Sequence, residues 1–424
     1  MQKAVLFFIV ILTINVTYSQ DKTFNIGLEF RPRILIDNGY KTPKSINENT
    51  TAYITQRTRL NIVYKNDKLE TYISVQDIRF WGGDNIYKGS GAFGNTGSLN
   101  LHQAWFSFKP SLTLSIKTGR QLFKYDDQRI LASRNWNDYQ ITYDALLFQF
   151  NDKINRLDVG LTWNSETTKS FIYPDEKFKV FDFIRYEREQ NNFNLSVIGL
   201  LTGNTINDTT ESIYLRGTYG LNLNYMKDDF KIITSVYYQN SLNNFGQNIN
   251  AYCFSISTKQ NIFQKKASIG IGLDYLSGND ETNIDNDYQS TNHRFDILYG
   301  RRHGWYGYMD YFSTTPEQGL QDYIIKTEYL FIKNLTLQLD YHYFLMAAYK
   351  YNLEDTALKL NKNLGHEFDF TLKWKIIKEA SLQAGYSFFL MNNSLKQIKE
   401  VHNEELRFPQ FAYIMITLKP ILFD

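Results

Sequence analysis

The feature that most constrains the fold of this chain is an alternation of apolar and polar residues that recurs along most of its length. In residues 213–225, one face carries apolar and aromatic side chains and the other carries mainly polar ones. The first face holds Ile213, Leu215, Tyr219, Leu221, Leu223 and Tyr225, and the second holds Tyr214, Arg216, Thr218, Asn222 and Asn224. Residues 267–275 and 335–345 repeat the pattern. A period of two residues is that of a β-strand, so the sequence predicts an all-β fold.

The length of these two-faced segments favours a transmembrane antiparallel β-barrel. A strand that crosses an outer membrane needs roughly 9–11 residues, with one face toward lipid and the other toward the interior. Only a closed barrel leaves no unpaired backbone groups facing lipid. A soluble β-sandwich also alternates, so the lengths of the connections must distinguish the two folds.

Short and long connections follow each other in turn along the chain. The short ones are residues 65–68, 110–111, 151–153, 189–192, 227–229, 333–334 and 378–379, and the long ones are 36–51, 81–98, 125–140, 164–177, 349–363 and 392–408. Outer-membrane barrels have short periplasmic turns and longer extracellular loops, so the barrel is favoured. Residues 277–319 are best taken as one long loop that contains the strand-like piece 305–312. The chain then has about 18 strands, an even number that places both termini on one side.

Composition excludes several other classes of protein. Mean hydropathy is −0.41, and after residue 16 no apolar run approaches the roughly 18–20 residues of a membrane-spanning helix. The aromatic share of 16% argues against disorder. The net charge of only +2 argues against a nucleic-acid-binding protein, which would carry a basic surplus.

The first 19 residues predict a signal peptide. Lys3 precedes an apolar run over residues 4–12, and the expected cleavage site lies between Ser19 and Gln20. We therefore expect a single domain over residues 20–424, an integral barrel in the outer membrane of a Gram-negative bacterium. Cys253 is the only cysteine, so no internal disulfide can form.

No residue pattern indicates a cofactor, a metal or an enzyme. His293 and His303 lie in the expected loop 277–319 without the spacing of metal ligands. The acidic stretch 280–287 offers oxygen ligands for calcium but lacks the glycine turn of a calcium loop. No recognisable spacing of Ser, His and Asp indicates a catalytic triad. We therefore expect neither catalytic residues nor a cofactor.

Charged residues on the polar faces are expected to point into the barrel. Arg57, Arg59, Arg156 and Arg216 all fall on such faces, and charges that line a pore set its ion preference. The later strands contribute acids instead, namely Asp274, Asp322, Glu328, Asp340, Glu367 and Asp369. The sequence thus predicts a positive arc that faces a negative arc. The alternative is that these charges pair across the interior and only brace it.

The densest local group of charges lies in residues 120–134. Asp126 and Asp127 are adjacent, and the cations near them in the sequence are Arg120, Lys124, Arg129 and Arg134. Such a group predicts a charge-assisted network in a loop that folds into the pore. Paired carboxylates can also serve acid–base catalysis, but guanidinium neighbours keep them ionised, which favours a structural clamp.

Several stretches carry a family resemblance: Gln56-Arg57-Thr58-Arg59-Leu60-Asn61 and residues 119–121, 125–129, 134–136, 274–280, 299–300, 306–312 and 364–375. Together they resemble the alginate export family of outer-membrane porins. The resemblance implies a single-chain barrel whose arginines and neighbouring acids guide an anionic polyuronate across the membrane. On the matching positions it implies a pathway of Arg57, Arg59, Arg120, Asp126, Asp127, Arg129 and Arg134. The polar faces add Arg156 and Arg216 to these candidates.

Arg120 fits this pathway only if the strand is irregular. It falls in phase with Leu112, Leu114 and Ile116, which are expected to face lipid. A β-bulge near Gly119 would be needed to turn Arg120 inward.

The leading hypothesis from the sequence is a passive outer-membrane channel for an anionic polysaccharide or oligosaccharide. The arginines would form a ladder of exchangeable contacts to carboxylates. We expect a monomer whose partners are outer-membrane lipid, the polysaccharide and, for export, a periplasmic secretion complex. The alternatives are a general porin or an importer of small anionic nutrients and, in another class, an outer-membrane enzyme or a surface adhesion protein.

Overall fold

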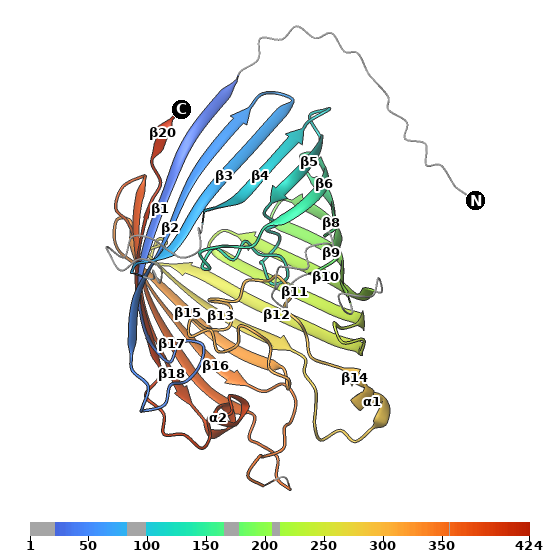
Figure 1. Ribbon diagram of the computed structural model, residues 1–424, viewed down its shortest axis with the longest axis vertical. Coiled ribbons are helices and arrows are strands. Elements are labelled where there is room, and N and C mark those ends of the chain that lie inside the picture. Colours follow the sequence, from blue (N-terminus) through green and yellow to red (C-terminus); the bar gives the residue numbers. More distant parts are fainter. Residues whose placement is uncertain (1–21, 83–98, 165–177, 206–212, 356) are drawn as a thin grey trace, which may run out of the picture.

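A computed structural model describes residues 22–82, 99–164, 178–205, 213–355 and 357–424. The expected signal peptide and most of the expected connections 81–98 and 164–177 lie outside these residues. Within the described part, the chain forms one closed barrel with two short helices in its connections (Figure 1).

The barrel wall consists of 18 strands that follow one another in chain order. They are β1 (Thr23–Asn38), β2 (Thr51–Lys65), β3 (Leu69–Phe80), β4 (Asn100–Phe108), β5 (Leu114–Gln121), β6 (Tyr143–Asn151), β7 (Asn155–Thr162), β8 (Val180–Gln190), β9 (Phe193–Thr205), β10 (Ile213–Lys227), β11 (Phe230–Leu242), β12 (Asn248–Ile262), β13 (Ala267–Leu276), β15 (Leu320–Ile332), β16 (Leu335–Leu345), β17 (Asn363–Lys375), β18 (Ala380–Met391) and β19 (Gln410–Leu418). Two short strands, β14 (Thr291–Asn292) and β20 (Ile421–Phe423), pair with β12 and β1. The helices are α1 (Asn286–Ser290) and α2 (Asn393–Ile398). The predicted all-β barrel of about 18 strands is confirmed.

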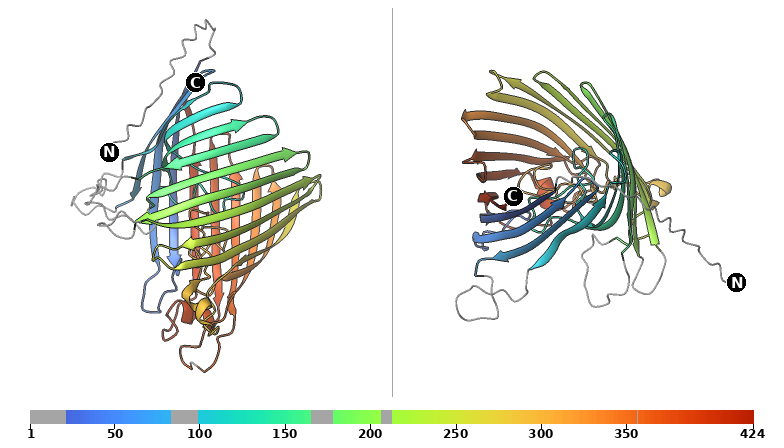
Figure 2. Two further views of the ribbon diagram at one scale, coloured as in Figure 1. Left: turned by 90° about the vertical axis from the view of Figure 1, so that its right-hand side faces the viewer. Right: turned by 90° about the horizontal axis from the view of Figure 1, so that it is seen from above.

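The first and last wall strands pair with each other and close the barrel. β1 is antiparallel to β2 on one side and to β19 on the other, where the register runs from Phe30↔Leu418 to Asn38↔Gln410. Closure satisfies the backbone groups that would otherwise form an open sheet edge. Seen from above, the strands surround segments of chain in the interior (Figure 2).

Short turns and long loops lie at opposite ends of the barrel. The start of β1, the short strand β20 and the turn between β2 and β3 lie together at one end (Figure 1). Connections 39–50 and 392–409 lie at the other end. Among the connections that the structure describes, the expected alternation is confirmed. Residues 305–312 belong to the connection between β13 and β15 and not to the wall, as the even strand count predicts.

The apolar faces of the strands point outward. Leu221, Ile271, Ile325 and Ile414 are all exposed on the outer surface, and Ile271 is 63% exposed. So large an apolar surface is stable in lipid and not in water. The fold and its outer surface are therefore those of an integral outer-membrane β-barrel. No helix in the described ranges is long and apolar enough to cross a membrane.

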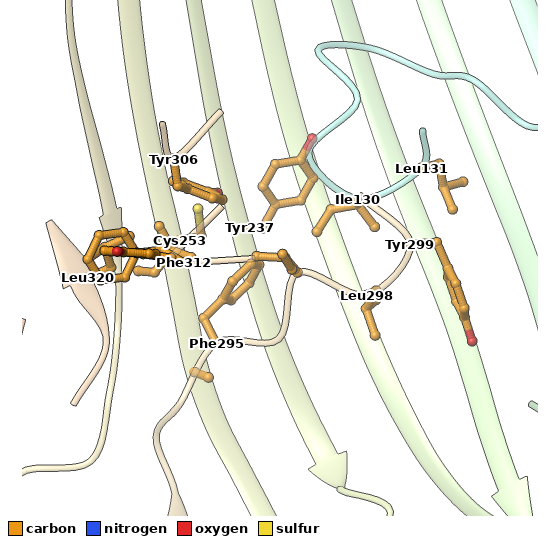
Figure 3. Close-up of a cluster of buried hydrophobic side chains, with 14 of the residues drawn as sticks. Ile130, Leu131, Tyr237, Cys253, Phe295, Leu298, Tyr299, Tyr306, Phe312 and Leu320 are labelled. Carbon is orange, nitrogen blue, oxygen red and sulfur yellow. The ribbon is translucent and has the colours of Figure 1, made fainter. Parts of the chain in front are cut away.

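Two connections fold into the barrel and carry much of its hydrophobic core. We call residues 122–142 the first inner loop and residues 277–319 the second inner loop. Figure 3 shows Ile130 and Leu131 of the first beside Leu298 and Tyr299 of the second. A β-bridge between Leu131 and Tyr299 joins the two loops. The core thus lies inside the barrel, and both loops are held against its wall.

The outward faces predict a stability effect that depends on depth in the membrane. We expect Ile271→Lys, in the middle of β13, to lower the free energy of unfolding by about 2–4 kcal/mol because it places a charge in lipid. Ile262→Lys, at the end of β12, is the matched control and should cost about 0–1 kcal/mol. Denaturant unfolding in lipid vesicles measures both values. Equal losses would contradict the assignment of these faces.

Candidate functional site

Two buried charge networks fasten the first inner loop to the wall. The Arg129 guanidinium contacts Asp127 at 2.8 Å and Asp274 of β13 at 2.7 Å. Asp126 accepts a hydrogen bond of 2.6 Å from Arg185 of β8. The predicted clamp is therefore present, but its partners Asp274 and Arg185 come from distant strands. Asp126, Asp127 and Arg129 fasten the loop and do not line the large cavity described below.

Four arginines on neighbouring strands form a row on the inner wall, which we call the arginine row (Arg31, Arg33, Arg57 and Arg59). Arg31 and Arg33 lie on β1 and Arg57 and Arg59 on β2, with Arg31 directly opposite Arg57. Two arginines separated by one residue point to the same face of a strand. Arg57 and Arg59 were expected on this face. Arg31 and Arg33 were missed, although they have the same spacing.

The tip of the first inner loop (residues 135–140, the loop tip) lies on this row. Asp138 bridges two arginines, with one oxygen 2.5 Å from Arg31 and the other 3.0 Å from Arg33. The same arginines donate to the backbone carbonyls of Asn135 at 2.7 Å and Trp136 at 2.9 Å. Burial alone would raise the pKa of Asp138, but Arg33 and Arg31 outweigh it and hold that pKa below its usual value.

The other two arginines of the row differ in their partners. Arg57 forms an ion pair with Glu29 of β1, and Lys419 lies 3.1 Å from the same carboxylate. Arg59 donates to Gln76 at 2.8 Å, to Gln140 at 2.6 Å and to the backbone carbonyl of Asp138 at 3.3 Å. In the described part of the chain, all hydrogen-bond acceptors of Arg59 are therefore neutral.

A cavity of about 1190 Å³ lies beside the row, bounded on the wall by β1–β4 and β17–β19 and in the interior by both inner loops. Its basic residues are Arg31, Arg33, Lys41, Arg59, Lys124, Arg134, Arg301, Arg302, Lys373 and Lys419. Its acidic residues, among those the structure describes, are Glu29, Asp138 and Asp310. Such a surplus of cations attracts anions.

Two acids of the later strands, Glu367 and Asp369, support the second inner loop. Glu367 accepts a hydrogen bond from the backbone N–H of Met309 at 2.7 Å, and Asp369 accepts one from Tyr308 at 3.3 Å. None of the six acids expected to form a negative arc lines the large cavity. The prediction of a positive arc facing a negative arc is therefore wrong for this cavity, because the second inner loop covers acids such as Glu367 and Asp369.

Arg120 lies on the outer face of the barrel. It stands opposite Ala104 and Asp144 in a regular register, in phase with the exposed residues Leu114 and Ile116. Its guanidinium forms an ion pair of 2.8 Å with Asp144. The bulge that would turn Arg120 inward is absent, and its position excludes it from an interior pathway.

The remaining predicted residues point inward but lie in different places. Arg134 lines the large cavity and donates to the carbonyls of Leu298 at 2.7 Å and Gly300 at 2.9 Å. Arg156 is paired with Asp158 at 2.9 Å. Arg216 is paired with Asp296 and lines a separate cavity of about 70 Å³. Of the predicted pathway residues, only Arg59 and Arg134 therefore line the large cavity.

The described residues contain no cluster of His, Cys, Asp and Glu that could hold a metal ion. The acidic stretch 280–287 forms local turns instead. Asp280 accepts from the backbone N–H of Thr282 at 2.9 Å, and Asp285 caps α1 by accepting from Tyr288 at 2.9 Å.

Solved structures that share this fold include several proteins of Pseudomonas aeruginosa, among them the outer membrane protein OprD. OccK11 (OpdR) superposes with a TM-score of 0.61 at 11% identity, covering 94% of this chain and 96% of its own. OprD gives a TM-score of 0.59 at 11% identity, with 94% of each chain covered. The shared feature is the barrel fold. No family model and no curated protein matches this sequence, so membership in the alginate export family stays a prediction.

The clamp predicts a large cost for the loss of Arg129. We expect Arg129→Ala to lower the free energy of unfolding by about 3–5 kcal/mol, because Asp127 and Asp274 would be left buried without a counter-charge. Lys265→Ala removes a cation from an exposed ion pair with Asp229 in the short turns and should cost about 0–1 kcal/mol. Denaturant unfolding compares the two variants. A loss for Arg129→Ala no larger than that for Lys265→Ala would contradict the clamp.

A second prediction concerns pH. His303 stacks on Trp136 with ring centroids 3.7 Å apart and bonds to Asp310 at 2.9 Å. Burial lowers the pKa of His303 below its usual value, although Asp310 opposes the shift. Unfolded histidine titrates near about 6.5, so the stability from neutral His303 is complete above that pH and decreases as the pH falls below it.

The measurement is the unfolding midpoint between about pH 7.5 and 5. The unfolding midpoint of His303→Gln should decrease less steeply with falling pH than that of the wild type, because the variant has no imidazole at this position to protonate. Identical slopes would show that His303 does not contribute to the pH dependence.

Proposed function

We propose that this protein is an outer-membrane channel for small organic anions, which diffuse passively along the arginine row. The observation that carries the proposal is Arg59, a cation beside the large cavity whose described acceptors are all neutral. A carboxylate can bind such a guanidinium without first displacing a resident acid. The cations around the cavity also raise the local concentration of anions.

The interior supports small anions better than a polysaccharide. The two inner loops and the core that they carry occupy much of the barrel, and the large cavity lies beside them, lined on the wall by β17–β19 and β1–β4. A path that shares the interior with two loops suits single small molecules. We therefore prefer an importer of small anionic nutrients. An exporter of an alginate-like chain and a general porin with a wide lumen are the less favoured alternatives.

OpdK and OprD of Pseudomonas aeruginosa, which share the fold, are outer membrane proteins, and they agree with this preference only at the level of fold. We propose a monomer in outer-membrane lipid, without a cofactor, in which the solute gradient sets the direction. The periplasmic secretion complex expected for export has no role in such uptake. An outer-membrane enzyme or an adhesion protein would not require the surplus of cations at the cavity.

Reversal potentials across planar bilayers test the proposal. We expect wild-type pores to prefer chloride over potassium, and Arg59→Gln to reduce that preference by roughly twofold to threefold because it removes a cation from the path. Arg120→Gln is the matched control, since Arg120 lies on the outer face, and should leave the preference unchanged.

Three further outcomes would decide between the hypotheses. If succinate blocks the current through the pores and oligouronate does not, small anions are favoured over a polysaccharide as the solute. A protein that forms no pores would exclude the channel class. Pores that prefer cations and do not respond to Arg59→Gln would exclude the arginine row as the path.

A further inference from the structure

Asp138 occupies the position that a bound carboxylate would take between two arginines. Its two oxygens contact Arg31 and Arg33 separately, at 2.5 and 3.0 Å. All three side chains are buried. The arginines belong to the rigid wall, whereas Asp138 belongs to a loop. A carboxylate site is therefore already formed in the wall, and a residue of the protein occupies it.

The loop tip does not satisfy all the donors of this site. The Nε atoms of Arg31 and Arg33 are buried and lack an acceptor among the described residues. Each arginine bonds to Asp138 through only one terminal nitrogen. Guanidinium binds carboxylate most strongly through two parallel hydrogen bonds. A carboxylate that is free to reorient could therefore use donors that Asp138 leaves unpaired.

The backbone is strained just before the loop tip, at Arg134, and at its last residue, Gln140. Arg134 has φ of +46° and Gln140 has φ of +62°, values that L side chains rarely adopt. Trp136 anchors one side of the tip by stacking on His303 and donating to Tyr40 at 3.1 Å. Asp138 is held by the arginine row, and its neighbour Tyr139 is 54% exposed. Exchange of the contacts to the row would therefore release the Asp138 side chain while Trp136 stays anchored.

The other acids at the cavity do not share this arrangement. Glu29 lies on β1 within the wall and cannot leave Arg57 without disrupting a strand. Asp310 bonds to Tyr40 and His303 and not to the arginine row. Asp138 is thus the one acid of the described cavity lining that is both on a loop and bound to the row.

We propose that Asp138 is a resident competitor at a carboxylate site formed by Arg31 and Arg33, and that a permeating carboxylate displaces it. This inference rests on the proposed function and deepens it, because it names the residue that sets the affinity of the path. Displacement breaks the two ion pairs that Asp138 makes with Arg31 and Arg33, and the solute carboxylate forms new ion pairs with the same arginines. Binding is therefore weak enough to be reversible, as conduction requires.

Single-channel recordings with succinate as the probe test this proposal. We expect Asp138→Asn to lower the half-blocking concentration of succinate by about tenfold, because the competing charge is gone and both arginines remain. Asp138→Glu keeps the charge and should stay within about twofold of the wild type. Asp310→Asn also removes an acid from the cavity but not from the row, and should likewise stay within about twofold.

The outcomes separate this inference from the proposed function. If wild-type pores prefer anions but Asp138→Asn does not bind succinate more tightly, the competitor is excluded and the channel remains. If wild-type pores show no anion preference, the proposed function is excluded, and the inference about Asp138 is excluded with it. Asp138→Ser serves as a second neutral variant. If neither neutral variant forms a heat-resistant barrel but Asp138→Glu does, the charge of Asp138 is needed for folding. That result would assign Asp138 a structural role and overturn the proposal.

Discussion

The structure depends on one constraint, namely that lipid offers no hydrogen-bond partner to the backbone. Every N–H and C=O of the wall must therefore bond to a neighbouring strand, and the pairing of β1 with β19 completes that requirement. The even number of strands follows from it, because each wall strand is antiparallel to both of its neighbours. The apolar outward faces follow as well, since the same lipid excludes charge.

Closure of so many strands creates an interior too wide for wall side chains alone to fill. The two inner loops occupy much of it, and each needs partners for its polar groups. Two acids of the later strands serve this purpose, because Glu367 and Asp369 accept hydrogen bonds from backbone N–H groups of the second loop. The arginine row serves the first loop in the same way. The arginine row differs from Glu367 and Asp369 in its position, because the row also borders the large cavity and those two acids do not.

The fold could be predicted from the sequence because apolar and polar residues alternate with a period of two and because short turns alternate with long loops. Phase along a strand is a local property, which is why Arg57 and Arg59 could be placed on the inner face. The partners could not be predicted in this way, because Arg129 and Asp274 are 145 residues apart and only closure of the barrel brings them together. Asp138 had no local signal, since a single acid in a polar loop has no periodicity. The expectation for Arg120 was wrong because it required a bulge that β5 does not have.

The ion pairs of Glu29 lie at the join between the first and last strands. Glu29 on β1 contacts Arg57 of the neighbouring strand and Lys419 just beyond β19, so that one carboxylate connects the two ends of the chain. This contact can form only after the last strand has been synthesised and inserted beside the first. A barrel arrested before that step would lack both this contact and the completed wall beside the arginines. The large cavity, whose lining includes Met415 of β19, is therefore completed only when the last strand has joined the first.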